Sequence, residues 1–246
     1  MFSNRYIFVY SSIMVVVVAI ALTIIAISLK PMQDANVRIE KMQNILKAIN
    51  ITATPKEAEA AYKKYIVKTF TLKADMTVDP SVDAFSVDLA KELKKTNPAD
   101  RLYPVYVAAL DNGDTSYIFP LRGKGLWGPI WGYVALKNDF NTIFGVMFDH
   151  KGETPGLGAE INTDKFQQQF FGKTIFDENG SFTSVKAIKG GAGPNNPHGI
   201  DAISGGTITS NGLSDMIHDG FTAYLPFLKT KIKQLNTDKT DGGTQL

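Results

Sequence analysis

The chain lacks cysteine altogether and has only three histidines among its 246 residues. Without cysteine it forms no disulfide and supplies no thiolate to a zinc ion or an iron–sulfur cluster. His150, His198 and His218 lie far apart, without the spacing typical of metal ligands. We interpret them as loop or surface histidines, and we expect no metal site and no catalytic residue in this chain.

An excess of charge of either sign is also missing. Beyond Lys30 the sequence carries 24 basic and 24 acidic side chains. A nucleic-acid-binding protein normally presents a basic surface, so this balance argues against nucleic acid as a partner. The length allows one or two domains with a substantial core.

Charged residues are absent from one long stretch near the N-terminus. From Tyr6 to Leu29 the sequence is rich in Val, Ile, Ala and Leu, and it is long enough to cross a bilayer as a helix. It exceeds the apolar core of a cleaved signal peptide. A buried core helix is the alternative, but the apolar character continues unbroken around the segment. We predict a retained single-pass anchor formed by residues 1–30, with residues 6–29 in the membrane.

The charges that flank this stretch favour a cytoplasmic position for the rest of the chain. Only Arg5 and the amino terminus precede the apolar run. Four basic residues follow within about 20 positions, the range over which such charges act: Lys30, Arg38, Lys41 and Lys47. Because large domains often cross the membrane regardless of this local count, charge alone leaves the orientation open.

The segment after the anchor, residues 31–100, is predicted to be mainly helical. Apolar residues recur at helical spacing over residues 36–49. Thr54–Glu57 has the pattern of a capping box with proline at the first helical position, which predicts a helix to about Thr69. Residues 80–100 are ambiguous, because they fit a strand poorly while Leu89–Leu93 favours a helix.

Residues 101–230 are predicted to form the core of the domain. Four β-rich runs with short connections predict antiparallel neighbours: Tyr103–Leu110, Ser116–Leu121, Ile130–Leu136 and Thr142–Phe148. Thr163 could cap a helix through Phe171, and Thr183–Ile188 is typical of a further strand. Residues beyond Phe227, and above all the segment 231–246, have the composition of a polar tail. The fold class is therefore α+β, with flanking helices on an antiparallel sheet.

The run Asp201–Ser210 is the most informative stretch. Gly205 and Gly206 loosen the backbone, and four side chains of the run carry hydroxyl groups. Asn211 opens an apolar-periodic stretch, so we predict a helix from there. Such a helix would aim free backbone N–H groups and a positive dipole end at the loop, which suits a phosphate. A simple hydroxyl-rich capping loop is the alternative.

Two glycine-bearing segments precede this run. Gly123–Gly128 matches the pattern of a dinucleotide-binding loop, but a strand is expected after it where such a loop needs a helix. We therefore expect no NADH site here, and interpret the segment as a flexible loop that exposes Leu126 and Trp127 or packs them in the core. Glu153–Gly158 is typical of a tight turn, stiffened by proline and allowing close backbone approach.

Asp201, Ser204, Gly205, Gly206 and Thr207 fill, in register, a motif that resembles the acceptor site of proteins carrying FMN as a phosphoester on threonine. Those families usually have alanine where this chain has Gly206, and either small residue leaves the hydroxyl position intact. Leu102–Tyr106, Pro120–Gly128, Glu153–Gly158 and Ser204–Thr209 occur in the order found in one such family. Together with the anchor they resemble the C subunit of the bacterial sodium-translocating NADH:quinone reductase. The G subunit of the ferredoxin-linked Rnf complex is the nearest rival.

The resemblance implies a function and a place in the cell. The chain would be an electron-transfer subunit in the inner membrane, with its domain on the extracytoplasmic side and other redox subunits as partners. A flavin transferase would attach FMN to Thr207, using FAD as donor. The implied flavin contacts are Leu126, Trp127, Glu153, Thr154, Gly156, Leu157, Gly158, Ser204, Gly205, Gly206, Ile208 and Thr209. A membrane-anchored binding or scaffolding module without flavin is the alternative from a different class.

Overall fold

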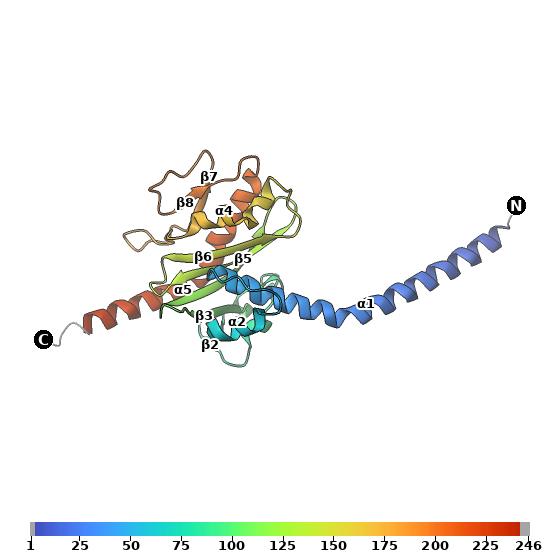
Figure 1. Cartoon of the computed structure of the whole chain (residues 1–246), viewed down its shortest axis with the longest axis horizontal. Helices are drawn as coiled ribbons and strands as arrows, with labels where there is room; N and C mark the ends of the chain where they lie inside the picture. The colour runs from blue at the N-terminus through green and yellow to red at the C-terminus, as the bar shows by residue number, and fades with distance from the viewer. Residues whose placement is uncertain (1–2, 242–246) are drawn as a thin grey trace. The chain divides into compact units, whose positions relative to one another are not determined.

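The computed structural model describes residues 3–241 (Figure 1). Its helices are α1 (Asn4–Ala48), α2 (Ala58–Tyr65), η1 (Ala84–Ser86), α3 (Leu89–Glu92), η2 (Pro98–Asp100), η3 (Gly158–Asn162), α4 (Asp164–Gln167), η4 (Gln168–Phe170) and α5 (Thr207–Asp241). Its strands are β1 (Ile66–Leu72), β2 (Val78–Asp79), β3 (Tyr103–Ala109), β4 (Thr115–Lys124), β5 (Pro129–Lys137), β6 (Ile143–His150), β7 (Lys186–Ile188) and β8 (Gly199–Asp201).

The chain separates into two compact units, one up to Met42 and one from Gln43 onward. The first consists of most of α1, whose most apolar window has a mean hydropathy of 2.9 and no buried residue. The predicted anchor, residues 6–29, lies within it. This helix is long and apolar enough to cross a membrane.

The second unit is built on a six-stranded sheet in the order β2-β1-β3-β4-β5-β6, in which every neighbouring pair is antiparallel. Figure 1 shows β3 to β6 side by side in green and yellow-green. These four strands are the four predicted runs, and the α+β fold class is confirmed. The short connections leave no room for the crossovers that parallel strands need.

Both faces of this sheet are covered, which explains why the central strands are almost continuously buried. Neighbouring residues of a strand point to opposite faces. Phe119 belongs to the core cluster formed with α5, whereas Ile118 belongs to the cluster formed with Ile45 and Leu46 of α1. The fold therefore has three layers, with the sheet in the middle.

The helix predicted from the capping box to about Thr69 is wrong over much of its length. Thr54 and Glu57 make the expected hydrogen bond, at 3.1 Å from the Thr54 amide to Glu57 Oε2, but α2 begins only at Ala58. From Ile66 the chain forms β1 and pairs with β3. This segment is rich in β-branched residues, and its pairing with β3 outweighs the local helical signal.

Three other segments have outcomes that differ from one another. The predicted strand Thr183–Ile188 is reduced to β7, and it pairs in parallel with β8 rather than joining the antiparallel sheet. The ambiguous residues 80–100 form the short helices η1, α3 and η2. The predicted helix after Thr163 is confirmed as α4 followed by η4, and the Thr163 hydroxyl accepts the Phe166 amide at 3.4 Å.

Helix α5 continues through Asp241, so the segment predicted as a polar tail is helical as far as the structure describes it. Phe227 and Leu228 are buried, and Ile232 and Leu235 pack partly buried against the core. These apolar residues keep helical spacing, so packing supports the helix as far as Leu235, although Pro226 interrupts the helical hydrogen bonding. Residues 242–246 lie outside the described part of the chain.

Strand β4 and helix α5 approach each other closely through glycines. A Cβ on Gly123 would lie 2.6 Å from Met216 Cβ, and one on Gly220 would lie 2.6 Å from Leu121 Cδ2. A Cβ on Gly212 would overlap the Lys124 carbonyl oxygen. These contacts place the end of β4, and the loop that follows it, against the first turns of α5.

Candidate functional site

Helix α5 begins at Thr207, four residues earlier than the sequence predicts. Gly205 has a φ of 73°, a left-handed conformation that favours glycine, and the Gly206 carbonyl accepts the Ser210 amide at 2.9 Å. Asn211 therefore lies inside the helix rather than at its start. The backbone N–H groups of Thr207 to Thr209 are those that a helix leaves without an internal partner. Thr207 thus stands at the positive end of α5.

The four hydroxyl groups of the motif are in different environments. Thr209 and Ser210 are buried. The Thr209 hydroxyl donates to Glu153 Oε2 at 2.6 Å, and the Ser210 Oγ accepts the Ile203 amide at 3.0 Å. Ser204 is exposed and Thr207 is half-buried, and within residues 3–241 the Thr207 hydroxyl has no hydrogen-bond partner. Ser204 and Thr207 are therefore the two hydroxyls that a reagent can reach.

The loop between β4 and β5 lies next to this helix start. Its turn is closed by the Gly125 amide, which donates to the Gly128 carbonyl at 2.8 Å. Strand precedes it and strand follows it, which confirms that it lacks the context of a dinucleotide-binding loop. The Trp127 amide donates to Glu153 Oε1 at 2.8 Å. One carboxylate therefore links this loop to α5.

Glu153 itself is buried, with 4 % of its surface exposed. Burial raises the pKa of its carboxyl. Hydrogen bonds from the Thr209 hydroxyl and from the backbone amides of residues 126–128 outweigh that effect, so the pKa lies below its ordinary value. The carboxyl is accordingly an anion at neutral pH. Sequence reasoning missed His150, whose Nδ1 accepts the Glu153 amide at 3.2 Å; only its position three residues earlier could have indicated this.

Glycines on both sides leave the space that the Glu153 carboxylate occupies. A Cβ on Gly125 would lie 2.6 Å from Glu153 Oε1. A Cβ on Gly158 would overlap Thr209 Oγ1 and approach Glu153 Oε2. Two of the glycines singled out in the sequence therefore permit one hydrogen-bonded bridge rather than a flexible loop.

The turn after Glu153 brings Leu157 to the motif. Gly156 has a φ of 75°, the Leu157 amide donates to the Thr154 carbonyl at 3.1 Å, and Thr154 itself is exposed. A Cβ on Gly205 would lie 2.7 Å from Leu157 Cδ2. The structure thus brings together all three segments in which the sequence places site residues.

Large apolar side chains are exposed around this helix start. In the described part of the second unit, eight large apolar residues are exposed, and four of them belong to these three segments. Trp127 is 69 % exposed, Ile208 58 %, Leu126 46 % and Leu157 40 %. Clustered exposed apolar residues mark binding surfaces. We call these four side chains, together with Thr207, the motif surface.

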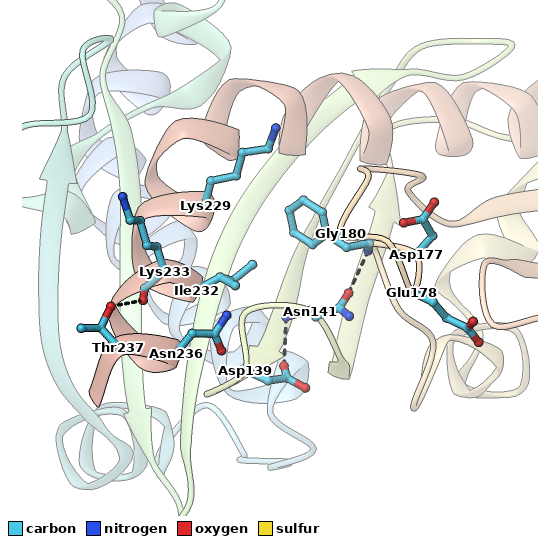
Figure 2. Close-up of a pocket in the computed structure, with 11 residues that line it drawn as sticks. Asp139, Asn141, Asp177, Glu178, Gly180, Lys229, Ile232, Lys233, Asn236 and Thr237 are labelled. Atoms are coloured by element: carbon cyan, nitrogen blue, oxygen red, sulfur yellow. Dashed lines mark hydrogen bonds between the residues drawn. The ribbon is translucent and has the colours of Figure 1, made fainter. Parts of the chain in front are cut away.

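A groove of about 950 Å³ lies elsewhere, along the C-terminal half of α5 (Figure 2). Lys229 and Lys233 of α5 line one side, and Asp139 and Asp177 come from the facing loops. At a rise of 1.5 Å per residue, Lys229 lies about 33 Å along the helix from Thr207. No residue that the sequence singles out lines this groove, so its volume does not make it the candidate site.

Comparison with known proteins decides the family. The model of the FMN-binding domain matches residues 125–222, which contain the whole motif surface. The C subunit of the Na(+)-translocating NADH-quinone reductase from Vibrio vulnificus strain YJ016 is 32 % identical over 214 residues, covering 80 % of this chain and 82 % of the relative. This chain belongs to the same family of reductase C subunits.

Solved structures of this family share the fold. The C subunit of the reductase from Parabacteroides distasonis superposes with a TM-score of 0.74 at 40 % identity, covering 81 % of this chain and 96 % of that one. NqrC from Shewanella oneidensis superposes with a TM-score of 0.68 at 29 % identity, covering 78 % and 98 %. The predicted family of reductase C subunits is confirmed.

Proposed function

We propose that the chain is the flavin-carrying electron-transfer subunit of a membrane sodium pump that couples NADH oxidation to quinone reduction, with FMN esterified through its phosphate to Thr207. One observation carries the proposal: within an FMN-binding family, the accessible hydroxyl of Thr207 stands at a helix N-terminus, beside four exposed apolar side chains.

These residues suit the two ends of FMN. The N–H groups of the first turn of α5 and the positive end of its dipole favour a phosphate at Thr207. A flavin ring is flat and largely apolar, and Leu126, Trp127 and Leu157 offer apolar contact. When bound, FMN would supply the redox chemistry. The protein would hold the ring and limit the access of water to it.

Attachment needs a donor and an enzyme. FAD consists of an FMN unit and an AMP unit joined through a pyrophosphate. In the transfer, the Thr207 oxygen would form a bond to the FMN phosphorus, the pyrophosphate bond would break, AMP would leave, and the hydroxyl proton would pass to a base. We infer that a flavin transferase catalyses this step and that Thr207 takes no part in turnover.

The relatives are named as subunits of a larger reductase, and we infer that this chain likewise works with other redox subunits. It would pass electrons between them and would oxidise little NADH alone, since the Gly123–Gly128 loop joins two antiparallel strands. We place the domain on the extracytoplasmic side because of the family resemblance. This placement goes against the local charge rule, but a large domain can cross regardless of that charge count.

Intact-mass analysis tests the attachment directly. The full chain is expressed with and without the flavin transferase and purified in detergent. The wild type should gain one FMN-sized adduct only in the presence of the transferase, and Thr207→Ala should gain none. A colourless, unmodified wild-type chain after coexpression would instead favour an anchored binding or scaffolding module.

A further inference from the structure

The Glu153 carboxylate lies under the motif surface rather than on it. Oε1 accepts the Trp127 amide at 2.8 Å, and Oε2 accepts the Thr209 hydroxyl at 2.6 Å. Both oxygens are thus engaged by the protein, and the residue is almost fully buried. Little of it remains for a bound ring to contact.

We propose that Glu153 is a positioning residue, which fixes the Leu126–Trp127 loop against the first turn of α5 so that the flavin finds its apolar contacts already beside Thr207. The proposal rests on the function proposed above, because it concerns the same site. It assigns Glu153 a role through Trp127 and Thr209 in place of direct contact with FMN.

The connections of Glu153 make it suited to this role. The residues that it joins lie 26 and 56 positions away in the sequence, and one follows β4 while the other lies in the first turn of α5. Buried hydrogen bonds that are fully satisfied rigidify the segments they join. Gly125 and Gly158 leave room for the carboxylate, so both neighbouring loops are shaped around it. Without the bridge, the exposed Trp127 side chain would lose its fixed position relative to Thr207.

The hydrogen bonds of Glu153 predict which substitution will preserve its positioning role. In Glu153→Gln the amide oxygen can accept the Trp127 N–H, and the amide nitrogen can donate to the Thr209 hydroxyl, which is able to accept. The glutamine therefore keeps the bridge but loses the charge. Glu153→Ala loses the bridge altogether, and Thr209→Val removes one of its two ends.

The test uses the full chain and purified transferase with FAD as donor. The rate of FMN attachment is measured by intact mass, and the visible circular dichroism of the attached flavin reports how firmly the ring is held. We expect Glu153→Ala to load at least tenfold more slowly and to lose at least half of the dichroism. Glu153→Gln should stay within about threefold of the wild-type rate. The rate of Thr209→Val should lie between those of Glu153→Ala and Glu153→Gln.

The matched control is Glu92→Ala. Glu92 is also a largely buried glutamate that accepts a backbone amide across the chain, from Leu102 at 2.8 Å, but it is not part of the motif surface. The Glu92→Ala variant should be less stable than the wild type but should gain FMN at the wild-type rate. Equal slowing of Glu92→Ala and Glu153→Ala, or equal slowing of the Gln and Ala variants of Glu153, would overturn the proposal.

The outcomes separate this proposal from the proposed function. If the wild type gains no FMN, the function fails. If the wild type is loaded, and Glu153→Ala matches it in rate and dichroism, only the positioning role fails. Should Glu153→Ala not fold, Thr209→Val decides, because it leaves the carboxylate in place; wild-type loading of that variant would reject the role.

Discussion

The two ends of helix α5 present different kinds of surface. At the N-terminal end, three distant segments converge on one hydroxyl, exposed apolar side chains gather, and a single buried carboxylate joins the segments. Along the C-terminal half there is a groove of about 950 Å³, but its walls carry separate charged side chains such as Lys229 and Asp177. The difference shows that the candidate site is identified by side chains that three segments bring together. The volume of a groove, taken alone, would have selected the other end of the helix.

The largest effect on FMN attachment should come from replacing the Thr207 hydroxyl with a methyl group at the N-terminal end of α5. Thr207→Val keeps the shape of the side chain but removes the hydroxyl that we propose forms the ester, so FMN attachment should fall below detection. The double variant Lys229→Ala/Lys233→Ala alters the other end of α5 and should be loaded as the wild type is. Intact mass after coexpression measures both. Loss of loading in the double variant would mean that the groove takes part in attachment.

The next largest effect, on stability, should come from disturbing the close contact between α5 and the end of β4, which positions the site. Gly212→Val adds a branched side chain where even a Cβ would overlap the Lys124 carbonyl oxygen. Overpacking of this kind typically costs about 1–3 kcal/mol, and backbone contact favours the upper part of that range. Urea unfolding of the wild type and variant measures the cost. Asn211→Ala, at the exposed neighbouring position, is the control and should change stability by less than about 0.5 kcal/mol.

A smaller effect is expected from the charge of Glu153, and it should depend on pH. The folded-state pKa of this carboxyl lies below its unfolded value of 4.5, so its ionised form stabilises the fold above that pH. This contribution is lost as the pH falls through the folded pKa. At pH 7, Glu153→Gln should therefore be less stable than the wild type by about 1 kcal/mol.

The measurement is the free energy of unfolding of both proteins between pH 7 and pH 3. The gap between them should stay constant above the unfolded pKa and narrow below it. A gap that widens on acidification would contradict the ionised bridge.

The central strands could be predicted from the sequence because local and global signals agree there. The runs that form β3 to β6 combine β-branched and aromatic residues with short turns. Strand β1 could not be predicted, since Ile66–Leu72 follows a helix start and becomes a strand only by pairing with β3. The helical turns around Ile232 and Leu235 were missed for a similar reason, because the core holds these two residues.

Of the site, the sequence indicated the segments but not how they are joined. Thr207, Trp127 and Leu157 could be singled out because their motifs occur in a family order. The start of α5 at Thr207 was missed, because Gly206 precedes it and glycine has no side chain that could give the usual capping signal. The burial of Glu153 between two segments has no local signature, since its partners lie 26 and 56 residues away.

The sequence by itself determined an apolar helix long enough to span a bilayer, an antiparallel domain, and a hydroxyl motif that is typical of its family. These follow from hydropathy, residue alternation and a run of adjacent residues, all of which are local properties of the chain. The tertiary structure alone decided which hydroxyls are accessible, which apolar side chains surround them and what holds the loops in place. Those properties depend on contacts between distant residues, and they arise where the loop after β4, the turn after Glu153 and the first turn of α5 pack together.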